Sequence, residues 1–438
     1  MVAARAGRLL RWLIIPAAFI GPGTVTTAAQ AGASYGPALL WSVTFSTLAC
    51  WLLQEGAARL AILGGHPLAE ALAQRYGRAL RWAAAGIIGF GCAAYQAGNL
   101  LGASAGLELA FGAGRRAAAL VLALLAALLL WNGRIQRTSQ LLGALVAVMA
   151  AAFCITGLRA ARHAGGLWAA AVLPQAPEGS ELLIVSLIGT TIVPYNLFLG
   201  SRLGQESSLR SMRAGLAVSV GLGGLITAMI LLAGTAVQGD FSFEAVAAAM
   251  RRELGPAGGV LFGAGLFAAG FTSAITAPYA AALTAAGLLG APDSSRWQPG
   301  GPAFRLVWLL VLCTGAAFAA ADIRPVPAII LAQGLNGLLL PLAAALLILL
   351  LSRMPRHAHP PLLNALMILV FGIIAWLGCL QSARALLQAL ALPAPGAGTL
   401  LRAAALPALL LTAWLALRVR RLTQPGSPAL RMGPGPTD

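Results

Sequence analysis

The sequence carries very little charge for its length. It has no lysine and only 12 acidic residues among 438, and charged residues make up 9% of the chain. Hydrophobic residues make up 59%. A soluble domain of this size needs much more surface charge, so the composition excludes that class and predicts a chain that crosses a lipid bilayer many times. The apolar runs are long, unlike the short alternating strands of a barrel, so the predicted fold class is an all-α polytopic membrane protein.

Residue types that carry chemistry are also scarce inside the apolar runs. Only Glu55 and Glu108 lie well within predicted spans, and the spacing of Glu55 from Arg59 predicts a local i,i+4 ion pair. All four histidines fall in loops, which disfavours an intramembrane proton relay and leaves a metal site at His357 and His359 as a minor alternative. The five cysteines have no paired spacing, so we predict buried thiols. No nucleophile–base pair stands within a span, so we expect neither an enzyme nor a cofactor.

All 29 basic residues are arginine, and the formal net charge is +17. They are spread thinly over loops rather than clustered, which argues against a nucleic-acid partner and indicates that they set membrane topology. Of the 29, 20 fall in loops on the N-terminal side of the predicted spans and 9 on the opposite side. This bias predicts a multi-pass protein of the bacterial inner membrane with both termini in the cytoplasm, if there are twelve helices.

We predict eleven or twelve membrane helices and a lipid bilayer as the surroundings. The predicted spans are 8–36, 38–63, 82–111, 116–131, 140–158, 181–200, 213–238, 257–289, 304–320, 326–351, 362–380 and 399–418. They form a first five-helix unit (1–158), an extracytoplasmic linker (159–180), a second unit (181–351), one or two extra helices (352–420) and a disordered tail (421–438). A cleaved signal peptide is disfavoured because a Gly-Pro-Gly sequence interrupts the first apolar run.

Two spans are interrupted at their middles. The first carries Gly21-Pro22-Gly23-Thr24, and the sixth carries Thr190-Thr191-Ile192-Val193-Pro194-Tyr195-Asn196. Proline has no N–H to donate and glycine disfavours helix, so each span is predicted to break into two half-helices. Breaks at membrane depth are tolerated only where the freed backbone groups face protein or a watery cavity. A pair of such breaks in corresponding halves is the best sequence indication of a transporter's substrate site.

The spacing of the two breaks, about 170 residues, predicts an internal repeat of five spans. Because five is odd, the second unit enters the membrane from the opposite side, which makes the repeat inverted. A weak internal match supports it, Gly89-Phe90 in span three against Gly270-Phe271 in span eight.

Several polar side chains at mid-depth are candidates for one cavity. Those predicted to contact a substrate are Gly21, Gly23, Thr24, Thr27, Thr191, Val193, Tyr195, Asn196, Gln333 and Asn336, and those predicted to line a pathway are Gln96, Asn99, Ser273 and Thr276. For any single residue, the alternative is an interhelical hydrogen bond, worth about 0.6 kcal/mol in a membrane. The paired breaks favour the cavity for the group as a whole.

At these breaks the chain resembles the Nramp family of divalent-metal transporters, and more closely its divergent bacterial Nramp-related branch. The matching stretches are Gly21 to Thr24, Gln30 to Ala33, Leu39 to Trp41, Leu53 to Leu60, Ala97 to Gly102, Pro194 to Leu199 and Ala332 to Gly337. The resemblance covers roughly residues 10–350. It implies a LeuT-like 5+5 inverted-repeat fold with broken helices 1 and 6, and alternating access.

The chain departs from the family at the residues that bind metal. By this resemblance, Gly21 and Thr24 stand where the family has an aspartate and an asparagine ligand, and Val193 and Tyr195 stand where it has a methionine and a histidine. The hard carboxylate and the soft sulfur ligand are therefore both missing. The remaining expected metal contacts are Gly21, Thr24, Val193, Asn196 and Gln333, which offer only carbonyl, hydroxyl and amide groups. Such a set suits a cation that keeps part of its hydration shell.

The sequence thus predicts an alternating-access transporter that moves a partly hydrated divalent metal cation through a midplane site. Two alternatives stay open. One is a carrier of a small organic solute such as an amino acid, whose carboxylate would sit at a half-helix N-terminus. The other is a receptor or scaffold that kept the fold and lost the site, which the missing ligands motivate.

Overall fold

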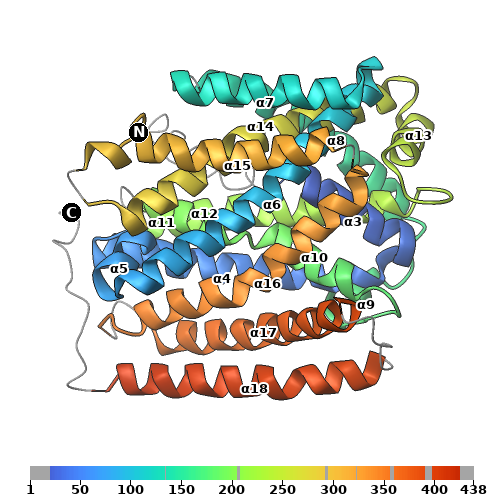
Figure 1. Ribbon diagram of the computed structural model, residues 1–438. Helices are drawn as coiled ribbons and strands as arrows, with labels where there is room; N and C mark the ends of the chain where they lie inside the picture. Colours follow the sequence, from blue (N-terminus) through green and yellow to red (C-terminus); the bar gives the residue numbers. More distant parts are fainter. Residues whose placement is uncertain are drawn as a thin grey trace.

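The computed structural model describes residues 20–133, 135–204, 208–291, 294–321, 323–355, 360–389 and 397–424, which form helices and no strand. The helices are α3 (Pro22–Tyr35), α4 (Leu40–Gly64), α5 (Leu68–Arg75), α6 (Arg78–Phe111), α7 (Arg115–Asn132), α8 (Ile135–Ala161), α9 (Leu167–Val172), α10 (Glu181–Thr191), α11 (Pro194–Gly204), α12 (Leu209–Gly234), α13 (Phe243–Leu254), α14 (Ala257–Leu289), α15 (Pro302–Ala320), α16 (Pro325–Leu351), α17 (Pro361–Ala389) and α18 (Ala397–Leu422). The long helices run side by side, with α7 along the top of Figure 1 and α18 along the bottom.

Most of the predicted spans agree with the observed helices to within a few residues, but α8 begins at Ile135 rather than at residue 140 and α17 continues to Ala389 rather than ending at residue 380. In the described residues, ten helical stretches are long and apolar enough to cross a membrane. The chain is therefore a multi-pass membrane protein. The 34-residue helix α6 is not among the ten, because polar residues such as Gln96 and Asn99 lower its hydropathy, yet it lies within the bundle (Figure 1). The start of the first span, His357, His359 and most of the predicted tail lie outside the described residues.

Three short helices were not predicted: α5, α9 and α13. Helix α9 lies inside the predicted 159–180 linker, and α9 and α13 lie at the right-hand end of the bundle in Figure 1. Helix α13 has recognisable sequence signals. Ser242 is the N-cap, and its hydroxyl oxygen accepts a hydrogen bond from the Ala245 N–H at 3.1 Å. Arg251 and Arg252 occupy the last turn, where their positive charge stabilises the partial negative charge of the helix C-terminus.

Local sequence explains where several long helices begin and end. Pro302 and Pro325 stand at the first positions of α15 and α16, where a missing N–H costs nothing. Gly65 and Gly112 end α4 and α6 with φ of 76° and 68°, a left-handed conformation that favours glycine. The polypeptide therefore turns back sharply at the ends of its spans.

The second predicted break is confirmed. Helix α10 ends at Thr191, Ile192 has φ −104° and ψ 81°, and α11 begins at Pro194. At the first break, α3 begins at Pro22 after an extended Gly21 with φ −109° and ψ −175°. The half-helix predicted before Gly21 lies outside the described residues.

Small residues such as Gly91, Gly98, Gly263 and Gly265 let the long helices approach closely. A methyl group added at Gly263 of α14 would lie 2.9 Å from the Gly106 carbonyl oxygen of α6, so the two backbones are in contact there. Close approach of this kind is the main source of packing energy between helices in lipid. It fixes α14 against α6 along the centre of the bundle.

The predicted ion pair is confirmed and is larger than expected. Glu55 Oε1 lies 3.0 Å from Arg59 Nε and 2.9 Å from Arg213 Nε, so it joins α4 to α12. At the other end of the bundle, Glu181 at the start of α10 lies 2.7 Å from Arg384 of α17, between Oε2 and a guanidinium nitrogen. This second pair ties a half-helix of the broken span to one of the extra helices.

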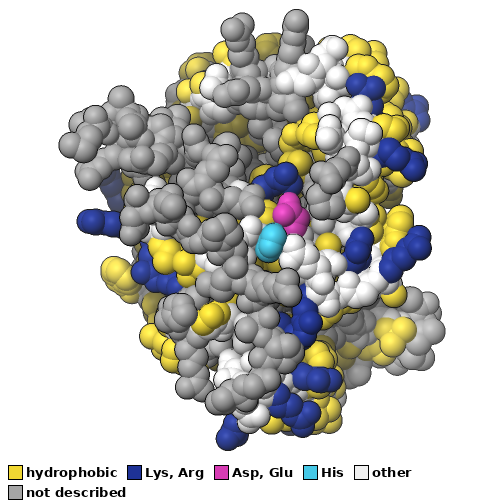
Figure 2. All heavy atoms as spheres, turned by 90° about the vertical axis from the view of Figure 1, so that its left-hand side faces the viewer, with side chains coloured by type: hydrophobic (Ala, Val, Ile, Leu, Met, Phe, Trp, Pro, Cys, Tyr) yellow, Lys and Arg dark blue, Asp and Glu magenta, His cyan; other side chains and the backbone are white. Residues whose placement is uncertain are grey.

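The face on the left of Figure 1, seen directly in Figure 2, carries many arginine side chains. They are scattered over its edges, with one acidic and one histidine side chain near the middle. The end of α18 and the start of α15 lie on this side (Figure 1).

Candidate functional site

The two breaks meet in the centre of the molecule. The hydroxyl oxygens of Thr24, in the first turn of α3, and Thr190, in the last turn of α10, lie 2.9 Å apart and share a hydrogen bond. Both side chains are at most 1% exposed. The residues are 166 positions apart in the chain, so this bond joins the predicted repeats at their interruptions.

Gln333 of α16 and Ser273 of α14 complete this junction. A methyl group added at Gly23 would lie 2.0 Å from Gln333 Nε2, and one at Gly21 would lie 3.0 Å from Ser273 Oγ. The Gln333 amide therefore rests directly on the first break. We call Gly21, Gly23, Thr24, Thr190, Ser273 and Gln333 the break cluster.

Two oxygens of the break cluster, Ser273 Oγ and Gln333 Oε1, are buried and have no hydrogen-bond partner among the described residues. Gln333 is 2% exposed and Ser273 is 3% exposed. An unsatisfied buried polar group costs about 1–3 kcal/mol, so such groups call for an explanation. A water or substrate that donates to Gln333 Oε1, or a cation beside it, would satisfy that oxygen, and Ser273 Oγ could either donate or accept.

Backbone groups freed by the breaks add to the polarity of the site. At the end of α10, Ile192 N donates to the Ile188 carbonyl at 2.9 Å, and the next backbone bond runs from Asn196 N to the Val193 carbonyl at 3.0 Å. The carbonyls in between have lost their helical partners. One of them, that of Gly189, accepts a hydrogen bond from the Tyr95 hydroxyl at 3.0 Å. The C-terminal end of a half-helix carries partial negative charge, which favours a cation.

Other predicted contacts bond within their own helices. Thr27 Oγ1 donates to the Gly23 carbonyl at 2.8 Å, Thr191 Oγ1 to the Leu187 carbonyl at 3.0 Å, and Thr276 Oγ1 to the Thr272 carbonyl at 3.1 Å. Hydroxyls bonded in this way are already satisfied. These three threonines border the break cluster rather than offering it free groups.

Val193 and Asn196 are buried beside the break, but no hydrogen bond between described residues joins them to the break cluster. The Asn196 carbonyl accepts from Gln54 Nε2 of α4 at 3.1 Å, and neither Nδ2 nor Oδ1 of Asn196 has a partner within the described part of the chain. The sequence analysis missed Gln54, although it lies in one of the motifs that resemble the family. The signal available in the sequence was a polar glutamine inside the predicted span 38–63.

Gln96 makes a structural contact. Pro278 inside α14 has no N–H, which leaves the Ala274 carbonyl without a helical partner, and Gln96 Nε2 donates to that oxygen at 3.0 Å. For this bond of Gln96, the alternative of an interhelical hydrogen bond is therefore correct. Asn99, one turn later, is buried with its Nδ2 unpartnered and its backbone carbonyl against Gly270.

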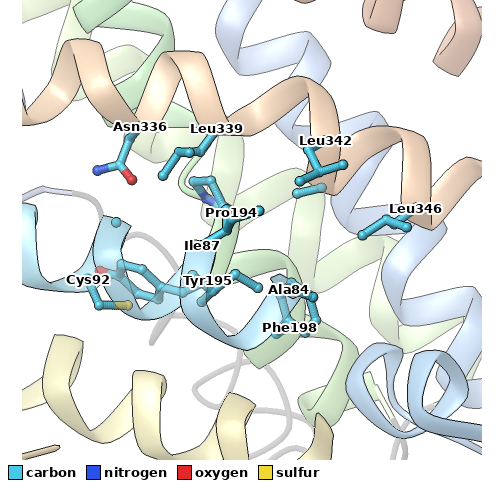
Figure 3. A pocket seen from close by; sticks show the side chains of 13 residues that line it. Ala84, Ile87, Cys92, Pro194, Tyr195, Phe198, Asn336, Leu339, Leu342 and Leu346 are labelled. Carbon is cyan, nitrogen blue, oxygen red and sulfur yellow. The ribbon is translucent and has the colours of Figure 1, made fainter. Parts of the chain in front are cut away.

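Tyr195 and Asn336 line a pocket between α6, α11 and α16 (Figure 3). Figure 3 shows Asn336 and Tyr195 at one end of it and the apolar side chains of Phe198, Leu342 and Leu346 at the other. Its free volume is about 20 Å³, room for about one water molecule. The pocket extends from the second break toward the arginine-rich end of the bundle, where α6 begins and α16 ends.

The site as a whole is polar and neutral. Within the part of the chain that the structure describes, no group of three or more His, Cys, Asp or Glu side chains could hold a metal ion. The available ligands are hydroxyl, amide and carbonyl oxygens. Oxygen ligands of this kind suit hard cations, whereas soft transition metals favour sulfur or imidazole.

A bundle of membrane helices with two interrupted spans meeting at mid-depth defines the class of secondary transporters built on broken helices. The family model "Natural resistance-associated macrophage protein-like" (Nramp) matches residues 12–382. The chain belongs to the Nramp family. It therefore has the family fold that the resemblance implied.

Individual relatives agree with this assignment. The chain is 28% identical over 277 residues to the divalent metal cation transporter MntH of Yersinia pestis (strain Pestoides F), covering 59% of this chain and 67% of the relative. It is 27% identical over 359 residues to MntH of Verminephrobacter eiseniae, covering 77% and 79%.

Solved structures show the same architecture. A crystal structure of the Eremococcus coleocola manganese transporter superposes with a TM-score of 0.68 at 21% identity, covering 94% of both chains. MHP1, a nucleobase-cation-symport-1 family transporter, superposes with a TM-score of 0.54 at 14% identity, covering 95% of both. The fold is the LeuT-like inverted repeat that the resemblance to the Nramp family implied.

Proposed function

We propose that this protein is an alternating-access transporter that moves a partly hydrated divalent metal cation through the break cluster. The observation that carries the proposal is a pair of buried oxygens, Ser273 Oγ and Gln333 Oε1, that lack a partner in the described part of a chain of the Nramp family and lie at its first break. Nothing in the site suggests catalysis, and we infer a carrier rather than an enzyme.

The ligand chemistry supports a hydrated ion. A bare divalent ion needs several anionic oxygens to replace its water, and the break cluster has none. Hydroxyl and amide oxygens can instead bind the water molecules of the hydration shell. We therefore infer that the protein discriminates poorly between magnesium and manganese, because neither a thioether nor an imidazole is present to favour the softer ion.

We further propose that the arginine-rich face lies in the cytoplasm of a bacterium, with the chain in its inner membrane. Arg75 and Arg78 flank the loop between α5 and α6 on that face, and loops rich in arginine are retained on the cytoplasmic side. The pocket lined by Tyr195 and Asn336 then lies on the cytoplasmic half of the route. We propose that Asn99 and Asn196, which keep unpartnered amide atoms, border that route.

Uptake into proteoliposomes tests the function. We expect magnesium and manganese to enter down their gradients and to compete with each other at similar concentrations. Gln333→Leu and Ser273→Ala should lower the initial rate at least ten-fold. Thr314→Val is the matched control, because Thr314 is exposed on α15 and bonds only to its own helix at the Leu310 carbonyl, 2.8 Å away.

Three outcomes would contradict the proposal in different ways. No flux of any divalent ion would remove the transport function and leave the receptor alternative. Uptake of an amino acid in place of a metal would favour the organic carrier. Full uptake by Gln333→Leu would place the substrate away from the break cluster.

A further inference from the structure

Tyr95 of α6 contacts the broken span on both sides of its interruption. Its hydroxyl donates to the Gly189 carbonyl at 3.0 Å, before the break. Its ring meets the ring of Tyr195 edge to face, with centroids 6.0 Å apart and planes at 88°, after the break. One side chain therefore bridges both half-helices of the sixth span to the third.

The bond to Gly189 replaces a helical hydrogen bond. In a continuous helix the Val193 N–H would donate to that carbonyl. Here the Ile192 N–H donates to Ile188 and the Asn196 N–H to Val193, and among the described residues no backbone N–H donates to Gly189. An unpaired carbonyl inside a membrane is costly. Tyr95 is 6% exposed, so its hydroxyl is shielded from water and supplies the missing donor.

The end of α10 is held from other directions as well. A methyl group added at Gly189 would lie 2.2 Å from the Gln333 backbone oxygen, so α16 packs directly against this residue. The next residue, Thr190, bonds to Thr24 of the first break. Gly189 is thus the point where α6, α10 and α16 meet beside the break cluster.

The neighbouring residue on α6 offers a useful contrast. Gln96 also donates to a carbonyl without a helical partner, that of Ala274, but this carbonyl lies in α14, which packs closely along α6. Tyr95 alone of these two joins α6 to a broken helix. Alternating access moves the broken helices relative to their surroundings, so the Tyr95 contact is the one that such a motion must disrupt.

We propose that Tyr95 is a positioning residue that fixes the unwound end of α10 and stabilises the conformation in which α6 is closed on the broken span. By occupying the Gly189 carbonyl, it sets which carbonyls of residues 190–192 remain for a substrate. This last point rests on the proposed transport function, whereas the conformational point does not. Loss of one such hydrogen bond corresponds to about a five-fold change in the equilibrium between two conformations.

The chain contains its own reporter for this equilibrium. Cys92 is fully buried on α6, one turn before Tyr95, and lines the pocket beside Tyr195. A parent protein that keeps only Cys92, with the other four cysteines changed to alanine, allows its alkylation by N-ethylmaleimide to be followed alone. Opening of α6 from the broken span should expose the thiol and speed its modification.

The test compares Tyr95→Phe with Tyr279→Phe in that parent. Phenylalanine at 95 keeps the ring on Tyr195 and removes the hydroxyl, which donates to the Gly189 carbonyl and also interacts with the Thr190 side chain next to it. Tyr279 is the matched control because its ring packs edge to face on Phe304, 5.5 Å away between α14 and α15. We expect Tyr95→Phe to be alkylated about five-fold faster, the change expected for one hydrogen bond, and Tyr279→Phe to stay within about two-fold.

An alkylation rate in Tyr95→Phe within two-fold of the parent, or an equal acceleration in Tyr279→Phe, would overturn the proposal. Hydrogen–deuterium exchange of residues 186–193 provides a second measurement without the cysteine substitutions. Faster exchange in Tyr95→Phe alone supports the role of the hydroxyl, and unchanged exchange contradicts it. Neither measurement needs a substrate, so a failure of the transport proposal would be seen separately, in the uptake assay.

Discussion

Gly23 and Gly189 both contact Gln333, but through different parts of that residue, and this difference yields a sharp prediction. A methyl group at Gly23 would lie 2.0 Å from the Gln333 side-chain nitrogen, Nε2. A methyl group at Gly189 would lie 2.2 Å from the Gln333 backbone oxygen and 2.7 Å from the Gly337 backbone nitrogen. The same substitution, Gly→Ala, therefore displaces a flexible side chain at one position and a helix backbone at the other.

The two substitutions should differ in their cost to stability. Carbon and nitrogen atoms in contact lie about 3.5–4 Å apart, so the Gln333 amide must move by more than about 1.5 Å in Gly23→Ala. A rotation of its side chain achieves this at a cost of about 0.5–1.5 kcal/mol. In Gly189→Ala, the backbones of α10 and α16 must separate, and overpacking of this kind costs about 1–3 kcal/mol or more.

Gly23→Ala, the less destabilising of the two substitutions, should nevertheless cause a large loss of transport. Gly23→Ala drives the Gln333 amide away from the break cluster, so we expect uptake to fall at least ten-fold while the protein stays monodisperse. Gly189→Ala should lower the thermal unfolding midpoint in detergent more than Gly23→Ala does. Measuring both properties for both variants separates the site from the packing.

The reasoning fails if Gly23→Ala transports normally, because Gln333 would then be dispensable at the first break. It also fails if Gly189→Ala is as stable as the parent, because the α10–α16 contact would then be looser than described. Gly86→Ala is the control, since nothing lies within 4 Å of a methyl group there.

Two further substitutions test interactions outside the break cluster. Gln96→Leu should lower the free energy of unfolding by about 1–3 kcal/mol, because it leaves the Ala274 carbonyl buried without a donor; the thermal unfolding midpoint measures this, and an unchanged midpoint would show that Ala274 finds another partner. Glu55→Gln should lower the free energy of unfolding by roughly 3 kcal/mol. This value is near the lower end of the cost of breaking a buried ion pair, because Arg213 is half exposed while Arg59 is buried. Glu55→Asp, which keeps the charge, should lose less, and equal losses would argue against the ion pair.

Much of this fold could be predicted from the sequence because lipid imposes simple rules on a chain. Long apolar runs mark the helices, and the proline and glycine residues at 21–23 and 194 mark the breaks. Helix α13 was missed because it is short and amphipathic, with its apolar face covered by α14 rather than by lipid.

The site was only partly predictable, since the sequence shows which residues are polar but not which carbonyl each one reaches. Gln96 and Gln333 are similar glutamines in buried spans. Gln96 donates to the Ala274 carbonyl, which Pro278 leaves without a helical donor. The Gln333 amide instead lies against Gly23, and its oxygen has no partner among the described residues. That distinction depends on the distances between helices, which the hydrophobic pattern of the sequence does not show. Tyr95 was missed for the same reason, because its partner lies 94 residues away.

The interrupted helices place different demands on the side chains around them. A carbonyl that has lost its N–H must be given a donor, and Tyr95 and Gln96 each do so for one carbonyl. A buried oxygen that no described residue donates to, such as Gln333 Oε1, destabilises the fold unless a water molecule or a substrate binds it. The protein therefore satisfies the Gly189 carbonyl at the second break and the Ala274 carbonyl that Pro278 frees in α14, and it leaves Ser273 Oγ and Gln333 Oε1 without a partner among the described residues. That separation supports the proposed carrier function, in which the surrounding bonds keep the half-helices folded and the two oxygens are the proposed contacts of a hydrated ion.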